Sequence, residues 1–342
     1  MEVVASMGAD FRLGDVAAYA RRVESLGYDA LSVPEAKHEG TLAAFAALGA
    51  TSRLRVNTGV LVAFARSPML AAQAAWDLQD FSDGRFVLGL GSQVKGNVTG
   101  RFGMPWSAPA ARMRDYVGAV RACFETFQNG TALNFESESY TLNRMQPFFN
   151  PGPLDCGPPP ILMGAVGPIM TRTVGTVGDM LQTHPTNSEA RFVREVTRPR
   201  LEEGRKRSSL EEPVKLLAGP LVATGRDQVA VDAALKSARE TLVFTLSTPA
   251  YWPVLEYHGW LEVGHRLRDL TRAGAWGEMD AAVSDEMIDT LVVSGTYEVI
   301  AERIVAQYAG LAEGVLFPVA PDSENDDAAR KAIEEIRKGD TA

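Results

Sequence analysis

The sequence predicts an (α/β)8 (TIM) barrel, because short apolar strands alternate with amphipathic helices along most of its 342 residues. The pattern is most complete where two apolar, β-branched runs, residues 56–62 and 86–91, flank one helix. Ser67, followed by a proline, is typical of a helix start, and Gly84 is typical of a helix end. Together these signals define one strand–helix–strand unit, and ligands bind beyond the carboxyl ends of such strands.

The remaining elements are predicted in chain order from the same signals. Strands are expected at residues 2–7, 30–33, 161–164, 179–184, 216–222 and 314–318. Helices are expected at residues 16–26, 110–128, 189–207 and 227–244, with a further one beginning at Pro168 and a small hairpin near 135–141. Within the helix after Ser67, the buried face is expected to contain Leu70, Ala74, Leu78 and Phe81.

The whole chain, residues 1–342, is expected to form a single barrel domain with one insertion at about residues 245–289. This segment is too long for one repeat, and it carries three of the five tryptophans and two of the four histidines. Large inserts after barrel strands usually shape substrate pockets, which predicts a position over the barrel mouth. A helical hairpin that serves a dimer interface would explain the same residues. The charged tail after residue 322 is expected to form a surface helix.

Composition and charge favour a small-molecule partner. The formal net charge of −9 argues against nucleic acid or an anionic membrane surface as a partner. The chain begins with a strand rather than a signal peptide and has no apolar run of membrane-spanning length, so a cytoplasmic protein is expected. Cys123 and Cys156 lack the spacing of metal ligands and are expected to be ordinary thiols, with no metal site.

Two turns at predicted strand ends are candidates for ligand binding. The first joins the strand at 161–164 to a helix, so its backbone amides and the positive end of the helix dipole could hold a phosphate. Its candidate residues are Ala165, Val166, Gly167 and Pro168. The second turn contains Gly91, Ser92 and Gln93, with Asn97 nearby, and would otherwise be a polar loop with ordinary turn hydrogen bonds.

Titratable residues also follow strand ends. His184 ends the strand at 179–184, where barrel enzymes collect catalytic residues, and imidazole titrates in a useful range. Glu35 and His38 follow the strand at 30–33. A single histidine is more often structural than catalytic, so both roles stay open. Arg112 and Arg114 could contact a phosphate or a substrate, although such arginines usually form solvated ion pairs.

The motifs TGV at 58–60, the Ser-Pro helix start and GRFVLGLG at 84–91 resemble the bacterial luciferase-like superfamily of flavin- and coenzyme F420-dependent oxidoreductases. AFARSP, GSQVK and RFGMPWSAP more specifically resemble an actinobacterial, F420-dependent branch. The resemblance covers nearly the whole chain. It implies a non-proline cis peptide bond at Gly59-Val60 beneath the cofactor ring, phosphate binding at the turn after residue 164, and cofactor contacts from Ser92, Gln93 and Asn97. It also implies a homodimer.

The resemblance leaves the proton donor open. F420-using relatives often carry an acidic residue followed directly by a histidine after the second strand. Here Glu35 fits, Ala36 stands in the place of the histidine, and His38 comes two positions later. Val94 replaces a glutamate that some relatives carry after the fourth strand. Glu35, His38 and His184 are therefore the catalytic candidates. Met7, Val60 and Phe64 could line the ring pocket, with ordinary core packing as the alternative for Met7 and Phe64.

Three functions are compatible with these features. The first is an F420-dependent oxidoreductase that transfers a hydride between C5 of the deazaflavin and a small organic substrate, with the cofactor supplying the chemistry. The second is an FMN-dependent luciferase-like monooxygenase, because the same scaffold holds reduced FMN in relatives. The third is a non-catalytic flavin- or F420-binding protein, which loss of the familiar acid–base positions would fit.

Overall fold

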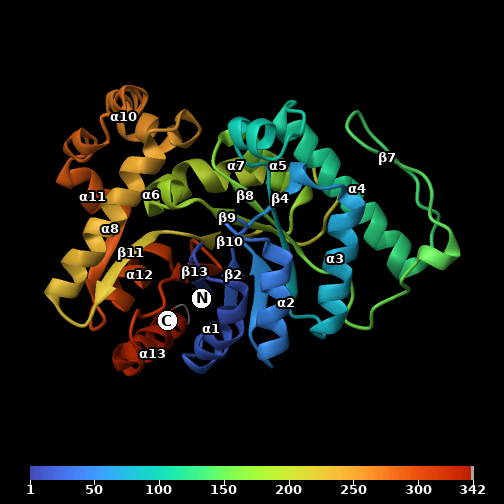
Figure 1. The fold of residues 1–342 in the computed structure, drawn as a ribbon, viewed down its shortest axis with the longest axis horizontal. Helices are drawn as coiled ribbons and strands as arrows, with labels where there is room; N and C mark the ends of the chain where they lie inside the picture. Colours follow the sequence, from blue (N-terminus) through green and yellow to red (C-terminus); the bar gives the residue numbers. More distant parts are fainter. Residues whose placement is uncertain (340–342) are drawn as a thin grey trace.

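The fold is a closed parallel barrel surrounded by helices, and the computed structural model describes residues 1–339 of it (Figure 1). Around the barrel the strands follow the order β3-β2-β1-β13-β10-β9-β8-β5, and β5 pairs with β3 to close the ring. The strands are β1 (Glu2–Ser6), β2 (Ala30–Val33), β3 (Arg55–Thr58), β4 (Leu61–Val62), β5 (Phe86–Gly91), β8 (Ile161–Ala165), β9 (Met180–Thr183), β10 (Lys215–Ala218) and β13 (Gly314–Phe317). The predicted fold class is confirmed.

The third barrel strand is interrupted, although the sequence predicted one strand over residues 56–62. Its halves, β3 and β4, both pair with β5 and are separated by a cis peptide bond between Gly59 and Val60. Continuous β-branched and apolar residues predict a strand, but they give no sign of a break. Only the resemblance to a known family located it.

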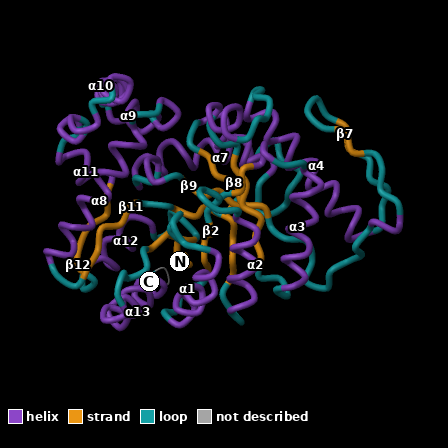
Figure 2. The backbone as a smooth tube through the Cα atoms, in the orientation of Figure 1, coloured by secondary structure: helices purple, strands orange, loops and turns teal. Residues whose placement is uncertain are grey.

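Helices cover the outer face of the barrel (Figure 2). They are α1 (Leu13–Ser25), α2 (Gly40–Ala50), α3 (Pro68–Phe81), α4 (Pro109–Asn129), α5 (Pro168–Val177), α6 (Ala190–Phe192), α7 (Arg198–Arg205), α8 (Gln228–Leu246), α9 (Pro253–His258), α10 (Leu261–Ala273), α11 (Asp285–Leu291), α12 (Ile300–Tyr308) and α13 (Asp326–Lys338). The Ser67 hydroxyl accepts a hydrogen bond from the Leu70 amide at 3.1 Å, which confirms the predicted start of α3.

The predicted buried face of α3 was partly wrong. Leu78 is buried, but Leu70 and Phe81 are 61% and 49% exposed. The helix instead packs through its small residues and one large ring, with Ala71, Ala72, Ala75 and Trp76 buried. Alanine is too common on all sides of this helix for a simple apolar stripe to reveal which side faces the barrel.

The predicted strand at 216–222 also divides, because the chain leaves the barrel after Ala218. Its second half, β11 (Leu221–Gly225), pairs in parallel with β12 (Val292–Thr296) in a separate two-stranded sheet. At the point of departure the Gly219 amide donates to the Thr183 hydroxyl at 3.0 Å, and Pro220 then has no N–H to continue the ladder.

The segment at 245–289 forms α9, α10 and α11 on the side of the molecule opposite the β6–β7 hairpin (Figure 1). Together with α8, β11 and β12 it encloses a second apolar core that includes Leu242, Leu255 and Leu267. One part of the segment reaches the barrel, since the ring of Tyr251 stacks on His184 with centroids 4.4 Å apart. The division into one domain with an insertion stays a prediction.

The hairpin near 135–141 is confirmed as the antiparallel pair β6 (Phe135–Glu136) and β7 (Thr141–Leu142). Cys123 is buried and Cys156 is exposed, and neither is in a disulfide. Across residues 1–339, no helix has both the length and the apolar character that crossing a membrane requires.

Candidate active site

The barrel lumen is apolar at its centre and becomes small and polar toward the mouth. Val4, Ala30, Val87, Leu162 and Leu217 form the central cluster. Side chains along a strand alternate between the two faces, so residues two positions later face the same lumen. These later residues are Ser32 on β2, Gly89 on β5, Gly164 on β8 and Gln182 on β9. Ser32, Gly89 and Gly164 are small, whereas Gln182 carries a long polar side chain.

The bulge at Gly59 is stabilised by the hydroxyl of Thr58. This hydroxyl donates to the Gly89 carbonyl and accepts from the Gly89 amide, both at 2.8 Å. It therefore replaces the ladder hydrogen bonds that β3 would otherwise make to β5 at this point. The Gly59 amide bonds to the Val33 carbonyl at 2.7 Å. The backbone at the bulge is thus held from both neighbouring strands.

Val60 projects from the bulge into the lumen, where it packs against the central cluster. A Cβ atom on Gly91 would come 2.4 Å from the Val60 Cγ2, and one on Gly164 would come 3.4 Å from its Cγ1. A Cβ atom on Gly59 would come 2.0 Å from the Ser32 hydroxyl. The predicted residues Gly59, Val60 and Gly91 therefore lie together, and a side chain at position 59 or 91 would clash with Ser32 or Val60.

Glu35 is fully engaged by the segment that follows the bulge. Its Oε2 accepts from the Val62 amide at 2.6 Å and from the Arg66 guanidinium at 2.9 Å, and its Oε1 accepts a third hydrogen bond from Arg66. Only 7% of its side-chain surface is exposed. A charged, bidentate pair of this kind fixes geometry. Glu35 therefore fixes the chain after Val60, and both of its oxygens are occupied. We call Glu35 and Arg66 the clamp.

His184 directly follows β9 at its carboxyl end, two positions beyond Gln182. Its Nδ1 is 2.9 Å from the Thr186 hydroxyl and accepts from the Thr186 amide at 3.3 Å, which places the proton of the neutral ring on Nε2. Burial lowers the pKa of His184 to about 4. The ring is therefore neutral near pH 7, and its Nε2 has no hydrogen-bond partner within residues 1–339.

The predicted phosphate turn is a helix start without a side-chain cap. Gly167 occupies the N-cap position of α5, Pro168 is the first helical residue, and no side chain accepts from the first-turn amides. The Asn187 side chain donates to the Val166 carbonyl at 3.2 Å, which holds the turn against the loop after β9. Ala165 ends β8 just before it. The amides at this helix start are available to an anion.

The polar side chains of the second predicted turn form hydrogen bonds to one another and to the backbone of the same turn. The Gln93 carbonyl oxygen Oε1 accepts from the Val94 amide at 2.8 Å and from the Asn97 carboxamide at 3.1 Å. The Ser92 hydroxyl donates to the Gln93 carbonyl at 3.3 Å. Gln93 has a φ of 60°. The three polar residues therefore lie together beside Gly91, at the end of β5.

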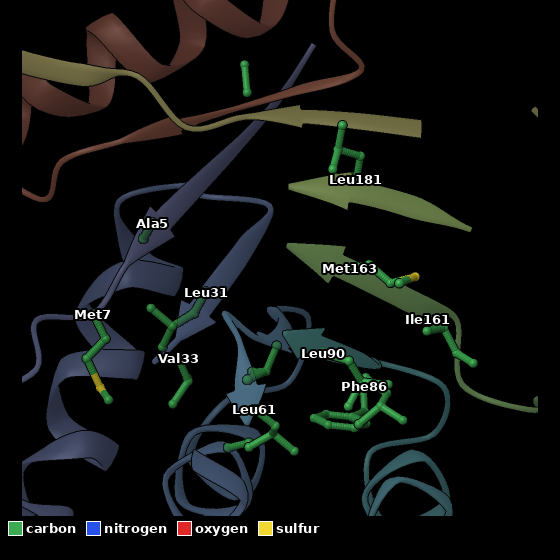
Figure 3. Packing of buried hydrophobic residues seen from close by; sticks show 14 of the residues in the cluster. Ala5, Met7, Leu31, Val33, Leu61, Phe86, Leu90, Ile161, Met163 and Leu181 are labelled. Carbon is green, nitrogen blue, oxygen red and sulfur yellow. The ribbon is translucent and has the colours of Figure 1, made fainter. Parts of the chain in front are cut away.

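Two predicted residues lie apart from the lumen. Met7 belongs to the outer core, beside Leu31 and Val33 (Figure 3). With the exposed His38 it lines a groove between the starts of α1 and α2. The lumen-facing residues of β1 and β2 are those of opposite parity, such as Val4 and Ala30. The structure thus separates Met7 and His38 from the group around Val60.

The aromatic and arginine candidates form a supporting cluster on the outer side. The Arg112 guanidinium lies 4.3 Å from the centre of the Phe64 ring and donates to the Tyr140 hydroxyl at 3.0 Å. Phe64 is fully buried in the outer core. Arg114 pairs with Asp115 at 3.1 Å. These contacts hold the start of α4 and leave none of the three side chains facing the lumen.

One residue at the mouth was missed by the sequence analysis. Gln182 faces the lumen near Gly59, and its buried Oε1 has no hydrogen-bond partner among residues 1–339. Its strand, β9, was predicted, and alternation from His184 would have pointed to it. The described residues contain no group of three or more His, Cys, Asp or Glu side chains that could hold a metal ion.

The geometry at the mouth suits a flat ring with a phosphate-bearing chain. Val60 offers an apolar surface on the bulge beside the glycines at 91 and 164, and the start of α5 offers amides that no side chain within residues 1–339 caps. A ring placed on Val60 would also lie near the Gln182 carbonyl oxygen on β9, which has no partner within the described residues, and His184 follows directly after that strand.

Known proteins are similar to this chain in sequence. An uncharacterised protein of Mycobacterium tuberculosis is 39% identical over 310 residues, covering 89% of this chain and 90% of that protein. A 5,10-methylenetetrahydromethanopterin reductase of Archaeoglobus fulgidus is 28% identical over 330 residues, covering 92% and 93%.

Solved structures agree on the fold. The coenzyme F420-dependent tetrahydromethanopterin reductase from Methanopyrus kandleri superposes with a TM-score of 0.76 at 19% identity, covering 99% of this chain and 97% of that one. An FMN complex of the oxygenating component of 3,6-diketocamphane monooxygenase from Pseudomonas putida superposes with a TM-score of 0.64 at 14% identity, covering 99% and 97%.

The family assignment comes from the sequence itself. The family model described as luciferase-like monooxygenase matches residues 2–313, which include the bulge, the glycine strand and both turns at the mouth. The resemblance to the luciferase-like superfamily and the predicted oxidoreductase class are thereby confirmed. This chain belongs to the luciferase-like monooxygenase family.

Proposed function

We propose that this protein is a coenzyme F420-dependent oxidoreductase that transfers a hydride between C5 of the deazaflavin and a small organic substrate. The observation that carries the proposal is the lumen-facing Val60 on its bulge, packed closely against Gly91 and Gly164 at the carboxyl ends of the strands. F420, when bound, supplies a hydride at C5. Two relatives support this choice of cofactor: the Methanopyrus kandleri structure is named as F420-dependent, and the Archaeoglobus fulgidus relative is named as a reductase of the same type of pterin.

The protein's own residues would hold and orient the cofactor. Val60 would pack on one face of the ring, and the free amides at the start of α5 would bind the phosphate. Ser92, Gln93 and Asn97 would contact the cofactor from the end of β5. The Glu35–Arg66 pair would keep Val60 in place by fixing the chain at Val62. Such positioning lowers the entropic cost of bringing ring and substrate together.

His184 is the proposed catalytic residue. Its neutral ring carries the hydrogen on Nε2, which has no partner within residues 1–339, so it can donate a hydrogen bond to a substrate oxygen and polarise it. Tyr251 covers the other side of the imidazole and excludes water from it. Glu35 is a poorer candidate because both its oxygens are occupied, and His38 because it lies in the outer groove.

An FMN-dependent monooxygenase is the second candidate. Two observations favour it. Glu35 is bonded to Arg66, and His38 lies in the groove between α1 and α2. The protein therefore lacks the adjacent acidic residue and histidine that F420-using relatives carry. The similarity to an FMN-bound monooxygenase supports the same alternative. A protein that binds either cofactor without turnover would fit the same geometry.

A binding titration separates these candidates. The purified protein is titrated with F420 and with FMN under identical conditions, with fluorescence quenching as the readout. The proposal expects F420 to bind at least tenfold more tightly and the complex to exchange hydride with a panel of alcohols, aldehydes and imines. Tighter binding of FMN with substrate-dependent oxygen consumption would favour the monooxygenase. Tight binding of either cofactor that stays inert to every substrate and to oxygen would favour the binding protein.

We also propose that the protein is a homodimer joined through α2 and α3. Large apolar side chains are exposed on these two helices: Leu42, Phe45, Leu70 and Phe81 are 49–61% exposed, and the rings of Phe45 and Phe81 are 4.7 Å apart. Apolar clusters of this kind mark interaction sites. Leu70→Glu should convert the protein to monomers in light scattering, whereas Phe148→Glu, at an exposed phenylalanine outside this cluster, should leave its mass unchanged.

A further inference from the structure

Gln182 combines a central position with an unmet hydrogen bond. It lies on β9 between Met180, which packs against the apolar lumen cluster, and His184 at the mouth. Its carbonyl Oε1 is buried and has no hydrogen-bond partner within residues 1–339. A Cβ atom on Gly59 would lie 3.4 Å from this oxygen, so the side chain reaches across the lumen to the bulge.

The other polar side chains near the bulge are satisfied by the protein. The Asn57 carboxamide donates to the Ser32 hydroxyl at 3.0 Å and to the Thr58 carbonyl at 3.2 Å. The Thr58 hydroxyl is bonded to both backbone groups of Gly89. Three other buried side-chain atoms lack partners in the described part of the chain, on Thr224, His258 and Arg268, and none of these residues belongs to a barrel strand. The Gln182 oxygen is therefore the unmatched group that faces the lumen.

An unmatched buried acceptor is costly. Leaving such a group without a donor destabilises the folded protein relative to one in which the group is bonded. Residues 1–339 supply no donor to this oxygen. The oxygen lies beside the bulge that carries Val60, at the carboxyl ends of the strands, where a bound ring could supply the donor.

We propose that Gln182 is a recognition residue for the heterocyclic edge of the bound ring, accepting a hydrogen bond from a ring N–H while Val60 packs on the ring face. The inference rests on the proposed function, since it requires a flavin-type ring at the mouth. Flavins and deazaflavins share a pyrimidinedione edge with an N–H donor, so Gln182 serves either cofactor. It sets the orientation of the ring, and the start of α5 holds the phosphate independently.

The test compares Gln182→Met, which keeps the length of the side chain and removes both polar groups, with Gln73→Met, the same change at an exposed position of α3. Each variant is titrated with F420 and with FMN, and the absorption spectrum of the bound cofactor is recorded. Thermal unfolding of the cofactor-free proteins is measured in parallel. Wild type that binds neither cofactor would refute the proposed function itself, whatever the variant does.

Opposite effects on the free and bound protein are expected. Removing an unmatched acceptor should leave the melting temperature of the free Gln182→Met protein unchanged or raise it. Loss of one neutral hydrogen bond should weaken binding of the cofactor that wild type prefers by about 5–10-fold and shift its absorption band. Gln73→Met should change neither. Affinity within twofold of wild type with an unshifted band would overturn the inference, as would a variant whose free form melts well below wild type.

Discussion

The two sides of the barrel mouth use their polar groups in opposite ways. On the β2–β5 side, hydrogen bonds inside the protein occupy the hydroxyl of Thr58, the carboxylate of Glu35 and the guanidinium of Arg66. On the β9 side, the Gln182 oxygen and the His184 Nε2 have no partner within residues 1–339. We propose that the first side builds the surface on which a ring lies, and that the second side supplies the polar groups that contact the ring and the substrate.

The comparison predicts that the clamp acts on the stability of the fold. Glu35→Ala would leave the Arg66 guanidinium, which is only 18% exposed, without its main partner. Breaking a buried pair in this way typically costs about 3–5 kcal/mol, to be measured by urea unfolding of the cofactor-free protein. Glu39→Ala is the control, because Glu39 contacts the same Arg66 at 3.3 Å from a more exposed position; it also caps α2 through the Leu42 amide, so the variant should lose about 1–2 kcal/mol, mostly from the cap. Equal losses in the free energy of unfolding for the two variants would contradict the stabilising role of the Glu35–Arg66 pair.

Replacing His184 should lower the turnover number and leave the affinity for the cofactor nearly unchanged. His184→Gln keeps a polar side chain but removes the imidazole, so the turnover number should fall by about 100-fold while the affinity for the cofactor stays within about threefold. His38→Gln is the control, since His38 is exposed in the outer groove and should lose less than about threefold. A larger loss for His38→Gln than for His184→Gln would reverse the assignment.

The lowered pKa of His184 also predicts a pH dependence of stability. The folded protein holds this ring neutral down to a pKa of about 4, whereas in the unfolded chain it takes a proton near pH 6.5. The unfolded state therefore binds more protons between these values, and stability falls as the pH decreases through that window. The loss from this residue should be about 2 kcal/mol at pH 5 relative to pH 8. Replacing His184 by Gln should flatten the urea-unfolding profile by this amount, and a profile of unchanged slope would contradict it.

Replacing Gly91 or Gly164 by alanine should have the smallest effect, and the loss of cofactor affinity should differ between the two positions. Gly91→Ala places a methyl group 2.4 Å from Val60 and should weaken cofactor binding by about tenfold, because the β-branched side chain of Val60 has little freedom to rotate away. Gly164→Ala meets Val60 at an ordinary contact distance of 3.4 Å and should weaken binding by less than about threefold. Isothermal calorimetry of both variants orders the two positions, and the reverse order would place the ring elsewhere.

Local sequence signals predicted the barrel well because each strand and most helices carry them. The capping serine at 67, the left-handed turn after α3 and the glycine strand β5 are all where the sequence indicates. The departures have long-range causes. The break at Gly59 depends on a hydroxyl that bonds to Gly89, 31 residues along the chain, and β11 leaves the barrel to pair with β12, about 70 residues away.

The site was predictable only in part, for the same reason. Motifs located Val60, Gly91 and the turn before α5, because these features are local. The partner of Glu35 is Arg66, 31 positions away, and no pattern in the sequence joins them. Met7, directly after β1, lies in the outer core, the alternative that the sequence analysis left open, since one step in alternation decides which face a residue takes.

The most direct test is the structure of the protein with its preferred cofactor bound. The account predicts that the ring packs against Val60, that its N–H edge meets the Gln182 oxygen, and that His184 Nε2 faces the open side where a substrate would enter. The phosphate should lie on the amides at the start of α5. A ring bound instead in the outer groove between Met7 and His38, or one that leaves Gln182 and His184 uncontacted, would contradict the division between the two sides of the mouth.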